Sequence, residues 1–120
     1  MRRGTVLYAQ FDPAFPGEAA KSRPCIVVSQ IGANRAAMGG GRGTLVVVPL
    51  TSKTAYVHPD GQVLIDDEDA MIQMGLRVAS KAQPEQMRAI SVDRVHRELG
   101  VTPSWLMWQV DEALRFHLSL

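Results

Sequence analysis

The sequence predicts a small α+β domain, in which an antiparallel and partly closed β-barrel is followed by a C-terminal helix. Residues 24–30 and 44–50 contain runs of β-branched residues, which are typical of buried strands. Toward the C-terminus, apolar residues recur instead at the spacing of a helix. Strands early in a chain and a helix at its end indicate an α+β arrangement.

Composition sets the first limits on function. A chain of 120 residues is expected to form one domain, spanning residues 1–120. The formal net charge of +1 does not mark the whole chain as a nucleic-acid binder, so any basic site must be local. The single cysteine, Cys25, excludes an internal disulfide and a cysteine-based zinc site, and its place in a strand run indicates a small buried side chain.

No membrane segment or signal peptide is predicted. The charged start of the chain is followed only by a short strand-like run, which breaks at Asp12-Pro13. No apolar run is long enough to cross a bilayer. We therefore expect a soluble cytoplasmic protein.

The first part of the chain is expected to alternate strands with loops. Asp12-Pro13 ends the first strand, and Glu18 is the only acid in the loop that follows. Such a loop between core strands can form the edge of a substrate site, although most loops of this kind only connect. The expected elements are strands at 5–11, 24–30 and 44–50, a loop at 14–22, one helical turn at 31–37 and a glycine-rich loop at 38–43.

The middle of the chain gives weaker signals. Pro84 argues for a sheet edge or a bulge at its position, because proline cannot donate to a strand ladder. The expected elements are a short strand at 56–58, a turn at 59–61, a better strand at 62–65, an acidic patch at 66–69, a short helix or irregular segment at 70–76, and a pair of strands within 79–90.

The end of the chain reads as helical. Val95 and Leu99 stand at helical spacing, which predicts a helix over 92–99 that stops at Gly100. Thr102-Pro103 is a typical helix start. The expected apolar stripe of the last helix is Leu106, Val110, Ala113, Leu114 and Leu118, flanked by Trp105 and Trp108, for which packing is favoured over base stacking.

Reactive side chains stand at one end of each β-branched run. Arg23 lies just before the first run, and Thr51 and Ser52 follow the second. If the two strands join one sheet, a guanidinium and a hydroxyl can converge at its edge. This pair suits phosphate chemistry, because Arg offers a planar fork of donors and Thr a short, stiff hydroxyl. The alternative is an ordinary surface arginine beside a turn.

A series of short motifs runs along nearly the whole chain. They are Arg3-Gly4, Asp12-Pro13, Gly17-Glu18, residues 23–29, Asn34, residues 47–52, residues 85–90 and residues 110–118. Single motifs of this kind recur by chance, but their order and number together are specific. On these motifs the chain resembles the MazF/PemK family of toxin endoribonucleases from bacterial toxin–antitoxin pairs.

The resemblance implies a fold, an activity and partners. The family fold is a small SH3-like antiparallel β-barrel (CcdB/PemK-like) with a C-terminal α-helix, assembled as a homodimer and inhibited by a cognate antitoxin. Its members cut single-stranded RNA at short sequences, with no metal and no cofactor. The ribose 2′-hydroxyl attacks the adjacent phosphate and leaves a 2′,3′-cyclic phosphate and a 5′-hydroxyl. The family's catalytic Arg and Thr fall on Arg23 and Thr51.

Further residues are candidates for weaker roles. Glu18, Glu85 and His58 are candidates for catalysis or proton transfer, although solvated or salt-bridged roles are equally compatible with both acids. Residues expected to contact RNA are Ser52, Lys53, Asn34, Gln86, Arg77 and Arg88. His96 and His117 are expected to be structural, and no set of His, Asp and Glu has metal-ligand spacing.

The chain also departs from the family pattern. Ala19, Ala89 and Ser91 replace residues that are usual there, and residues 54–75 align poorly. Two alternatives therefore stay open: a toxin of the same fold that binds DNA gyrase without catalysis, and a degenerate member that only binds its antitoxin or RNA. The presence of both Arg23 and Thr51 favours catalysis.

Overall fold

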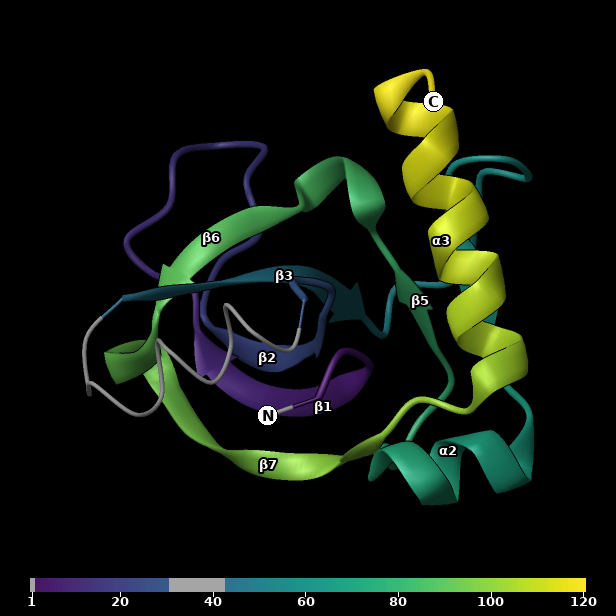
Figure 1. Cartoon of the computed structure of the whole chain (residues 1–120), viewed down its shortest axis with the longest axis horizontal. Helices are drawn as coiled ribbons and strands as arrows, with labels where there is room; N and C mark the ends of the chain where they lie inside the picture. Colours follow the sequence, from purple (N-terminus) through teal and green to yellow (C-terminus); the bar gives the residue numbers. More distant parts are fainter. Residues whose placement is uncertain (1, 31–42) are drawn as a thin grey trace.

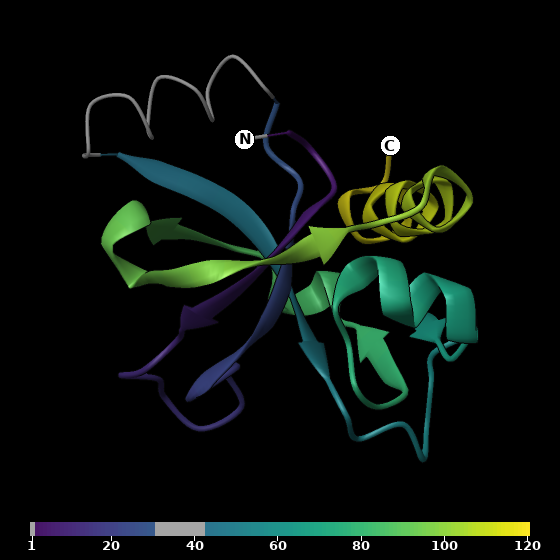
Figure 2. The ribbon, with the colours of Figure 1, turned by 90° about the horizontal axis from the view of Figure 1, so that it is seen from below.

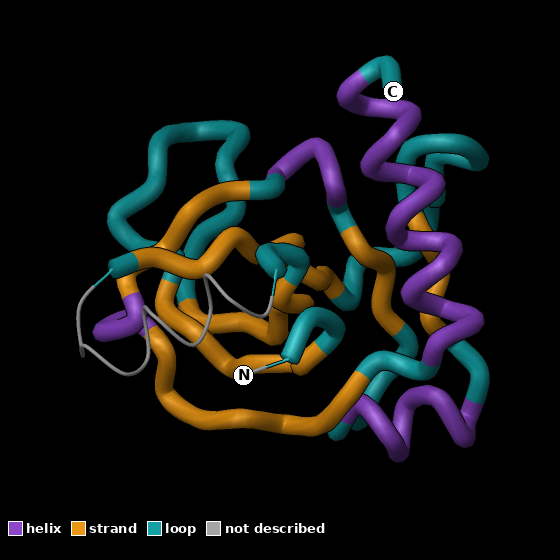
Figure 3. Tube along the Cα trace, in the orientation of Figure 1, coloured by secondary structure: helices purple, strands orange, loops and turns teal. Residues whose placement is uncertain are grey.

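A strongly curved antiparallel sheet of seven strands forms the centre of the computed structural model, which describes residues 2–30 and 43–120 (Figure 1). The elements in chain order are β1 (Thr5–Gln10), β2 (Ser22–Val27), β3 (Thr44–Thr51), β4 (Val63–Ile65), α2 (Glu68–Met74), β5 (Ser80–Ala82), the 3₁₀ turn η1 (Pro84–Gln86), β6 (Arg88–Ser91), the 3₁₀ turn η2 (Val92–Arg94), β7 (Val95–Val101) and α3 (Ser104–Leu118). Figure 3 shows the strands curling around a common centre, with α3 outside them.

The curl of the sheet comes from a change of partner along β3. The strands follow the order β4-β5-β3-β2-β1-β7, and β6 also pairs with β3. The first half of β3 pairs with β6, whereas Leu50 and Thr51 pair with β5. Over the ranges that the structure describes, no ladder joins β4 to β7, so the barrel is open at one seam. The predicted antiparallel, partly closed barrel with a terminal helix is confirmed.

Strand alternation sends side chains into two separate cores, because successive residues of a strand face opposite sides of the sheet. One core packs the sheet against α2 and α3, which lie on the same side of the sheet in Figures 1 and 2. It includes Val6, Ile26, Val48, Leu50, Met74, Leu106, Val110 and Ala113. The other core lies inside the curl and includes Leu7, Ala9, Phe11, Ala19, Cys25, Val27, Leu45, Val47 and Ile90. Each large aliphatic side chain buried in this way contributes about 1.5–3 kcal/mol.

The end of α2 is pressed against β7. A Cβ atom added to Gly100 would lie 2.2 Å from the carbonyl oxygen of Gln73, and one added to Gly75 would lie 2.3 Å from that of Leu99. Gly75 also ends α2 with a φ of 74°, a left-handed conformation that favours glycine. The two glycines therefore permit a backbone approach that no other residue allows.

The helix predicted over 92–99 is wrong, since these residues form η2 and most of β7. The spacing between Val95 and Leu99 fits a helix, but it also places both residues on one side of a strand. Pairing with β1 supplies the backbone hydrogen bonds of β7. His96 therefore lies on a strand and not on a helix.

The middle of the chain follows the prediction more closely. α2 begins at Glu68, where the side chain of Asp67 accepts the N–H of Ala70 as an N-cap. β5 and β6 form the predicted pair of extended segments, and Pro84 starts the turn η1 between them. The short strand expected at 56–58 is absent from the described residues. The helical turn expected at 31–37 and most of the glycine-rich loop lie outside them.

The last helix starts later than predicted and leaves its tryptophans exposed. Pro103 takes the cap position and α3 begins at Ser104, while the Thr102 hydroxyl is buried without a hydrogen-bond partner among the described residues. Trp105 and Trp108 are 51% and 65% exposed, so the prediction that they pack in the core is wrong. None of the helices in the described ranges has the length and apolar character needed to span a bilayer.

Candidate functional site

A cavity of about 900 Å³ opens where β2 begins and β3 ends. Its walls come from the loop before β2, the first residues of β2, the end of β3 with the residues that follow, the segment after α2, and β7. Arg23 and Thr51 both line this cavity. Segments far apart in the sequence therefore meet at the edge of the sheet that the strand-end residues had indicated.

The two predicted catalytic residues lie near the same end of neighbouring strands. The ladder between β2 and β3 ends with the pair Cys25 and Pro49, and Arg23 and Thr51 each lie two residues beyond this pair, where both line the cavity. The Nε–H group of Arg23 donates to the carbonyl oxygen of Ala20 at 2.9 Å, which fixes the direction of the guanidinium. Both side chains are half-buried, so they are held by the scaffold and remain open to the cavity.

The cavity is strongly cationic although the whole chain is nearly neutral. Its lining contains five cationic side chains, Lys21, Arg23, Lys53, Arg77 and Arg97, and one carboxylate, Glu18. No carboxylate forms an ion pair with any of these cations in the part of the chain that the structure describes. Clustered cations without local counter-charges attract anionic ligands such as phosphodiesters. The chain thus has a basic site, and this site is local, as the small net charge led us to expect.

Gln86 fixes the loop that forms one wall of the cavity. Its Oε1 atom accepts the N–H of Ala19 at 3.0 Å, and its Nε2 atom donates to the carbonyl oxygen of Gly17 at 2.9 Å. Within the same loop, Oε1 of Glu18 accepts the N–H of Phe15 at 2.7 Å. Gln86 lines the cavity, where the prediction of an RNA contact placed it, and it also holds the loop in place.

Glu85 and His58 do not line the cavity. Oε2 of Glu85 accepts an N–H of Gln62 at 2.6 Å, and Gln62 accepts in turn from Nζ of Lys81 at 2.9 Å. Nδ1 of His58 accepts the N–H of Gly61 at 2.9 Å, which closes the turn before β4. Both side chains are occupied in holding the segment between β3 and β4, and the structure does not bring them together with Arg23 or Thr51.

The other predicted RNA contacts fall into two groups. Ser52, Lys53 and Arg77 line the cavity. Arg88 does not, because its guanidinium donates to the carbonyl oxygen of Phe11 at 3.2 Å and stacks over the Phe11 ring. Asn34 lies outside the described residues.

Sequence reasoning missed Tyr8 and Arg97, which also line the cavity. Arg97 was assigned to a helix that is in fact β7, so its neighbours could not be predicted. The valines at 92, 95 and 101 were the available signal, since β-branched residues favour a strand. Near this pair, Oγ of Ser22 lies 3.0 Å from Nε2 of His96.

The described residues offer neither an accessible cysteine nucleophile nor a cluster of metal ligands. Cys25 is fully buried, and desolvation raises the pKa of its thiol from 9.0 to about 12, which keeps it protonated and unreactive. Across residues 2–30 and 43–120, no group of three or more His, Cys, Asp or Glu side chains could hold a metal ion.

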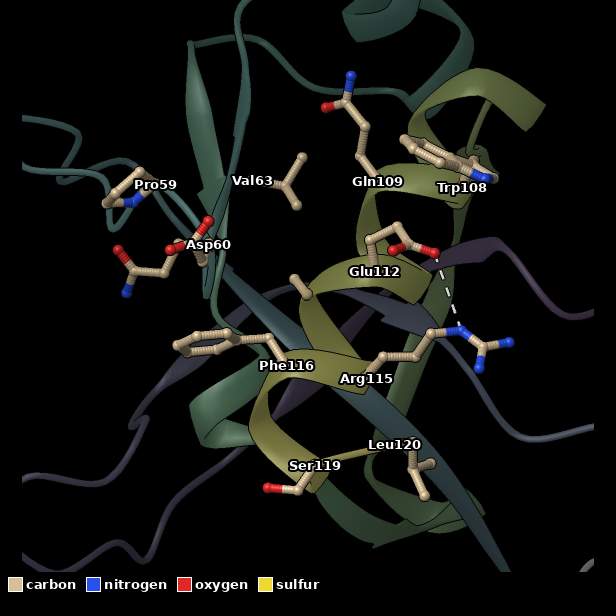
Figure 4. Close-up of a pocket in the computed structure, with 12 residues that line it drawn as sticks. Pro59, Asp60, Val63, Trp108, Gln109, Glu112, Arg115, Phe116, Ser119 and Leu120 are labelled. Atoms are coloured by element: carbon tan, nitrogen blue, oxygen red, sulfur yellow. Dashed lines mark ion pairs between the residues drawn. The ribbon is translucent and has the colours of Figure 1, made fainter.

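A second cavity, of about 630 Å³, lies between the turn before β4 and the exposed face of α3 (Figure 4). Trp108 and Phe116 line it together with Glu112 and Arg115, whose side chains form an ion pair at 3.8 Å. It contains none of the predicted catalytic residues. Of the two cavities described, only the first therefore contains both Arg23 and Thr51.

Comparisons with known proteins show the family to which the chain belongs. The chain is 43% identical over 120 residues to endoribonuclease MazF9 of Mycobacterium tuberculosis, and the alignment covers all of this chain and 98% of the relative. MazF from Deinococcus radiodurans superposes with a TM-score of 0.75 at 19% identity over 100% of this chain and 97% of that one. A mycobacterial endoribonuclease solved in complex with its cognate antitoxin also gives 0.75, at 18% identity over 100% and 96%. The family model described as PemK-like, MazF-like toxin of type II toxin-antitoxin system matches residues 2–118, and the chain belongs to this family.

Proposed function

We propose that this chain is the toxin of a type II toxin–antitoxin system and acts as an endoribonuclease on single-stranded RNA, with mRNA in the cytoplasm as its substrate. The observation that carries the proposal is the meeting of Arg23 and Thr51 at one cationic cavity. The full-length identity of 43% to a protein named endoribonuclease supports the same activity.

The proposed reaction is an internal transesterification. The ribose 2′-oxygen loses its proton and attacks the adjacent phosphorus, the bond from phosphorus to the 5′-oxygen breaks, and the leaving 5′-oxygen takes up a proton. The products are a 2′,3′-cyclic phosphate and a 5′-hydroxyl. No metal ion is required in this scheme, because the charge that develops on the phosphate is met by protein side chains.

Arg23 is assigned the stabilisation of that charge. Negative charge grows on the non-bridging oxygens during attack, and a fixed guanidinium aimed at them stabilises the transition state more than the ground state. The bond from Arg23 to Ala20 gives the guanidinium the fixed direction that this role needs. Removal of one such donor typically lowers the rate roughly 100- to 1000-fold.

Thr51 is assigned the positioning of the phosphate or of the attacking hydroxyl, since a Thr hydroxyl is a weak base on its own. Its Oγ1 atom accepts the N–H of Lys53 at 3.2 Å, which leaves its proton free for a phosphate oxygen. Glu18 is the one carboxylate in the cavity lining and is the candidate to accept the 2′-hydroxyl proton.

The proposed partners are a cognate antitoxin and a second copy of the chain. An acidic antitoxin segment would compete with RNA for the cationic cavity and so inhibit cleavage. Solved relatives include MazE–MazF from Deinococcus radiodurans and the mycobacterial endoribonuclease with its cognate antitoxin.

Incubation of the purified chain with a long RNA in EDTA tests the proposal. We expect cuts at one short motif, with 5′-hydroxyl ends found by mapping the fragments. The cuts should be lost in Arg23→Ala, and Arg115→Ala, which removes an exposed arginine outside the candidate site, is its matched control and should cut normally. Intact RNA, with the protein shown to be folded and dimeric, would contradict the activity, and binding to DNA gyrase would then be tested.

A further inference from the structure

Tyr8 and Arg97 form a cation–π pair in the wall of the cavity. The two residues are directly opposite each other in the ladder between β1 and β7. The Arg97 guanidinium carbon lies 5.5 Å from the centre of the Tyr8 ring, within the range of a cation–π contact. Tyr8 is half-buried and Arg97 is exposed, so Arg97 forms the outer layer of the pair.

The base of this pair is fixed by its neighbours. Tyr8 is paired on its other side with Pro24 of β2, and the His96 ring lies 5.6 Å from the Tyr8 ring. His96 is in turn held by its contact with Ser22 at 3.0 Å. A guanidinium held against such a base has less freedom of movement before a ligand arrives, which lowers the entropic cost of binding.

The position of Arg97 relates it to the proposed reaction. Arg97, Tyr8 and Pro24 lie side by side across β7, β1 and β2, and Pro24 directly follows Arg23. Two strand spacings, about 10 Å, separate the backbones of Arg97 and Pro24, and the side chains of Arg97 and Arg23 line the same cavity. A strand of RNA with its scissile phosphate at Arg23 would therefore pass Arg97.

Arg97 forms no ion pair with a carboxylate in the part of the chain that the structure describes. The ion pairs recorded among residues 2–30 and 43–120 join Arg3 to Asp111 and Arg115 to Glu112, and neither includes Arg97. The guanidinium, which lies against the Tyr8 ring, is therefore available to donate to a phosphate group. Planar arginine donors match phosphate oxygens bidentately, and this geometry is lost with lysine.

From these contacts we infer that Arg97 binds a phosphate of the RNA strand near the scissile one, with Tyr8 as the positioning residue that holds its guanidinium in place. The inference rests on the proposed endoribonuclease function. It assigns Arg97 to substrate binding and not to the chemical step, so its loss should act on KM and leave kcat nearly unchanged.

Binding to an uncleavable RNA tests this role. The probe is a short single-stranded RNA that contains the mapped cleavage motif, with a 2′-deoxyribose at the cut. We expect Arg97→Gln to raise Kd about tenfold, because one charge-assisted contact is lost. The slope of log Kd against log salt should fall by about 0.7, the value for one phosphate on a single strand.

Matched variants separate positioning from charge and from folding. Arg97→Lys should recover the salt slope but only part of the affinity, and Tyr8→Leu should weaken binding whereas Tyr8→Phe should not. Arg115→Gln, an exposed arginine outside the cavity, is the control for loss of one positive charge. Unfolding midpoints are measured for every variant.

Two results would overturn the inference. One is an unchanged Kd and salt slope in Arg97→Gln, and the other is a Tyr8→Leu variant that binds RNA as tightly as Tyr8→Phe. Both results count only if the wild-type chain is shown to cleave RNA. A wild-type chain that cuts no RNA would instead contradict the proposed function itself, so the two failures are distinguishable.

Discussion

At the scale of single residues, the site depends on side chains that hold other groups in place. Arg23 is directed by a backbone carbonyl at Ala20, and the loop that carries this carbonyl is held by Gln86. The amide of Gln86 acts as an extra peptide group, because it accepts one backbone hydrogen bond and donates another. A residue expected to contact RNA thus also holds the loop to which the guanidinium of Arg23, the proposed catalytic residue, is hydrogen-bonded.

Removing this amide should slow cleavage without unfolding the protein. Gln86→Ala loses both hydrogen bonds to the loop, and we expect a roughly tenfold lower single-turnover rate, since misplacement of a catalytic group by about 1 Å costs up to 100-fold. Gln86→Glu keeps the acceptor for Ala19 but loses the donor to Gly17, so its cleavage rate should lie between those of Gln86→Ala and the wild type.

Limited trypsin digestion supplies the structural readout for these variants. Lys21 is exposed at the end of the same loop, and cleavage after it should be faster in Gln86→Ala than in the wild type. Gln109→Ala, on the exposed face of α3, is the control. An unchanged rate with an unchanged digestion pattern would show that Gln86 does not position the loop.

At the scale of elements, the strand that was wrongly predicted as a helix is β7, which contributes Arg97 to the wall of the cavity. The early strands were predicted because β-branched runs favour buried strands in most contexts. β7 was predicted as a helix because the spacing of Val95 and Leu99 satisfies both periods, and the pairing that decides between them involves β1, far away in sequence. Such pairing partners cannot be read from a single segment.

The contact between α2 and β7 should be intolerant of side chains. Gly100→Ala places a methyl group 2.2 Å from the carbonyl oxygen of Gln73, so the backbone must shift. We expect a loss of about 1–3 kcal/mol in the free energy of unfolding, measured by urea denaturation. RNA cleavage should fall as well, because Gly75, Leu76 and Arg77 follow α2 in the cavity wall.

A neighbouring substitution controls for the loss of any α2 contact. Gln73→Ala removes an exposed side chain but keeps the carbonyl oxygen that Gly100 approaches, and its unfolding midpoint should stay near that of the wild type. If Gly100→Ala were as stable as Gln73→Ala, the close backbone approach would not limit this position.

At the scale of the whole molecule, the fold gathers cationic side chains at one cavity although the chain as a whole is nearly neutral. Arg23 and Thr51 could be predicted because each stands at the end of a strand with a recognisable pattern. The other cations of the cavity, Lys21, Lys53, Arg77 and Arg97, are scattered along the chain. Only the three-dimensional arrangement distinguishes them from Arg88, whose guanidinium donates a hydrogen bond to the carbonyl oxygen of Phe11.

The central claim is that Arg23 stabilises the transition state of RNA cleavage at this cavity. The most direct test is the single-turnover rate at one mapped RNA site for wild type and Arg23→Ala, in EDTA, with both proteins shown to have the same unfolding midpoint. We predict a loss of roughly 100- to 1000-fold in Arg23→Ala. Cleavage by Arg23→Ala at the wild-type rate would contradict the assignment of this cavity as the catalytic site.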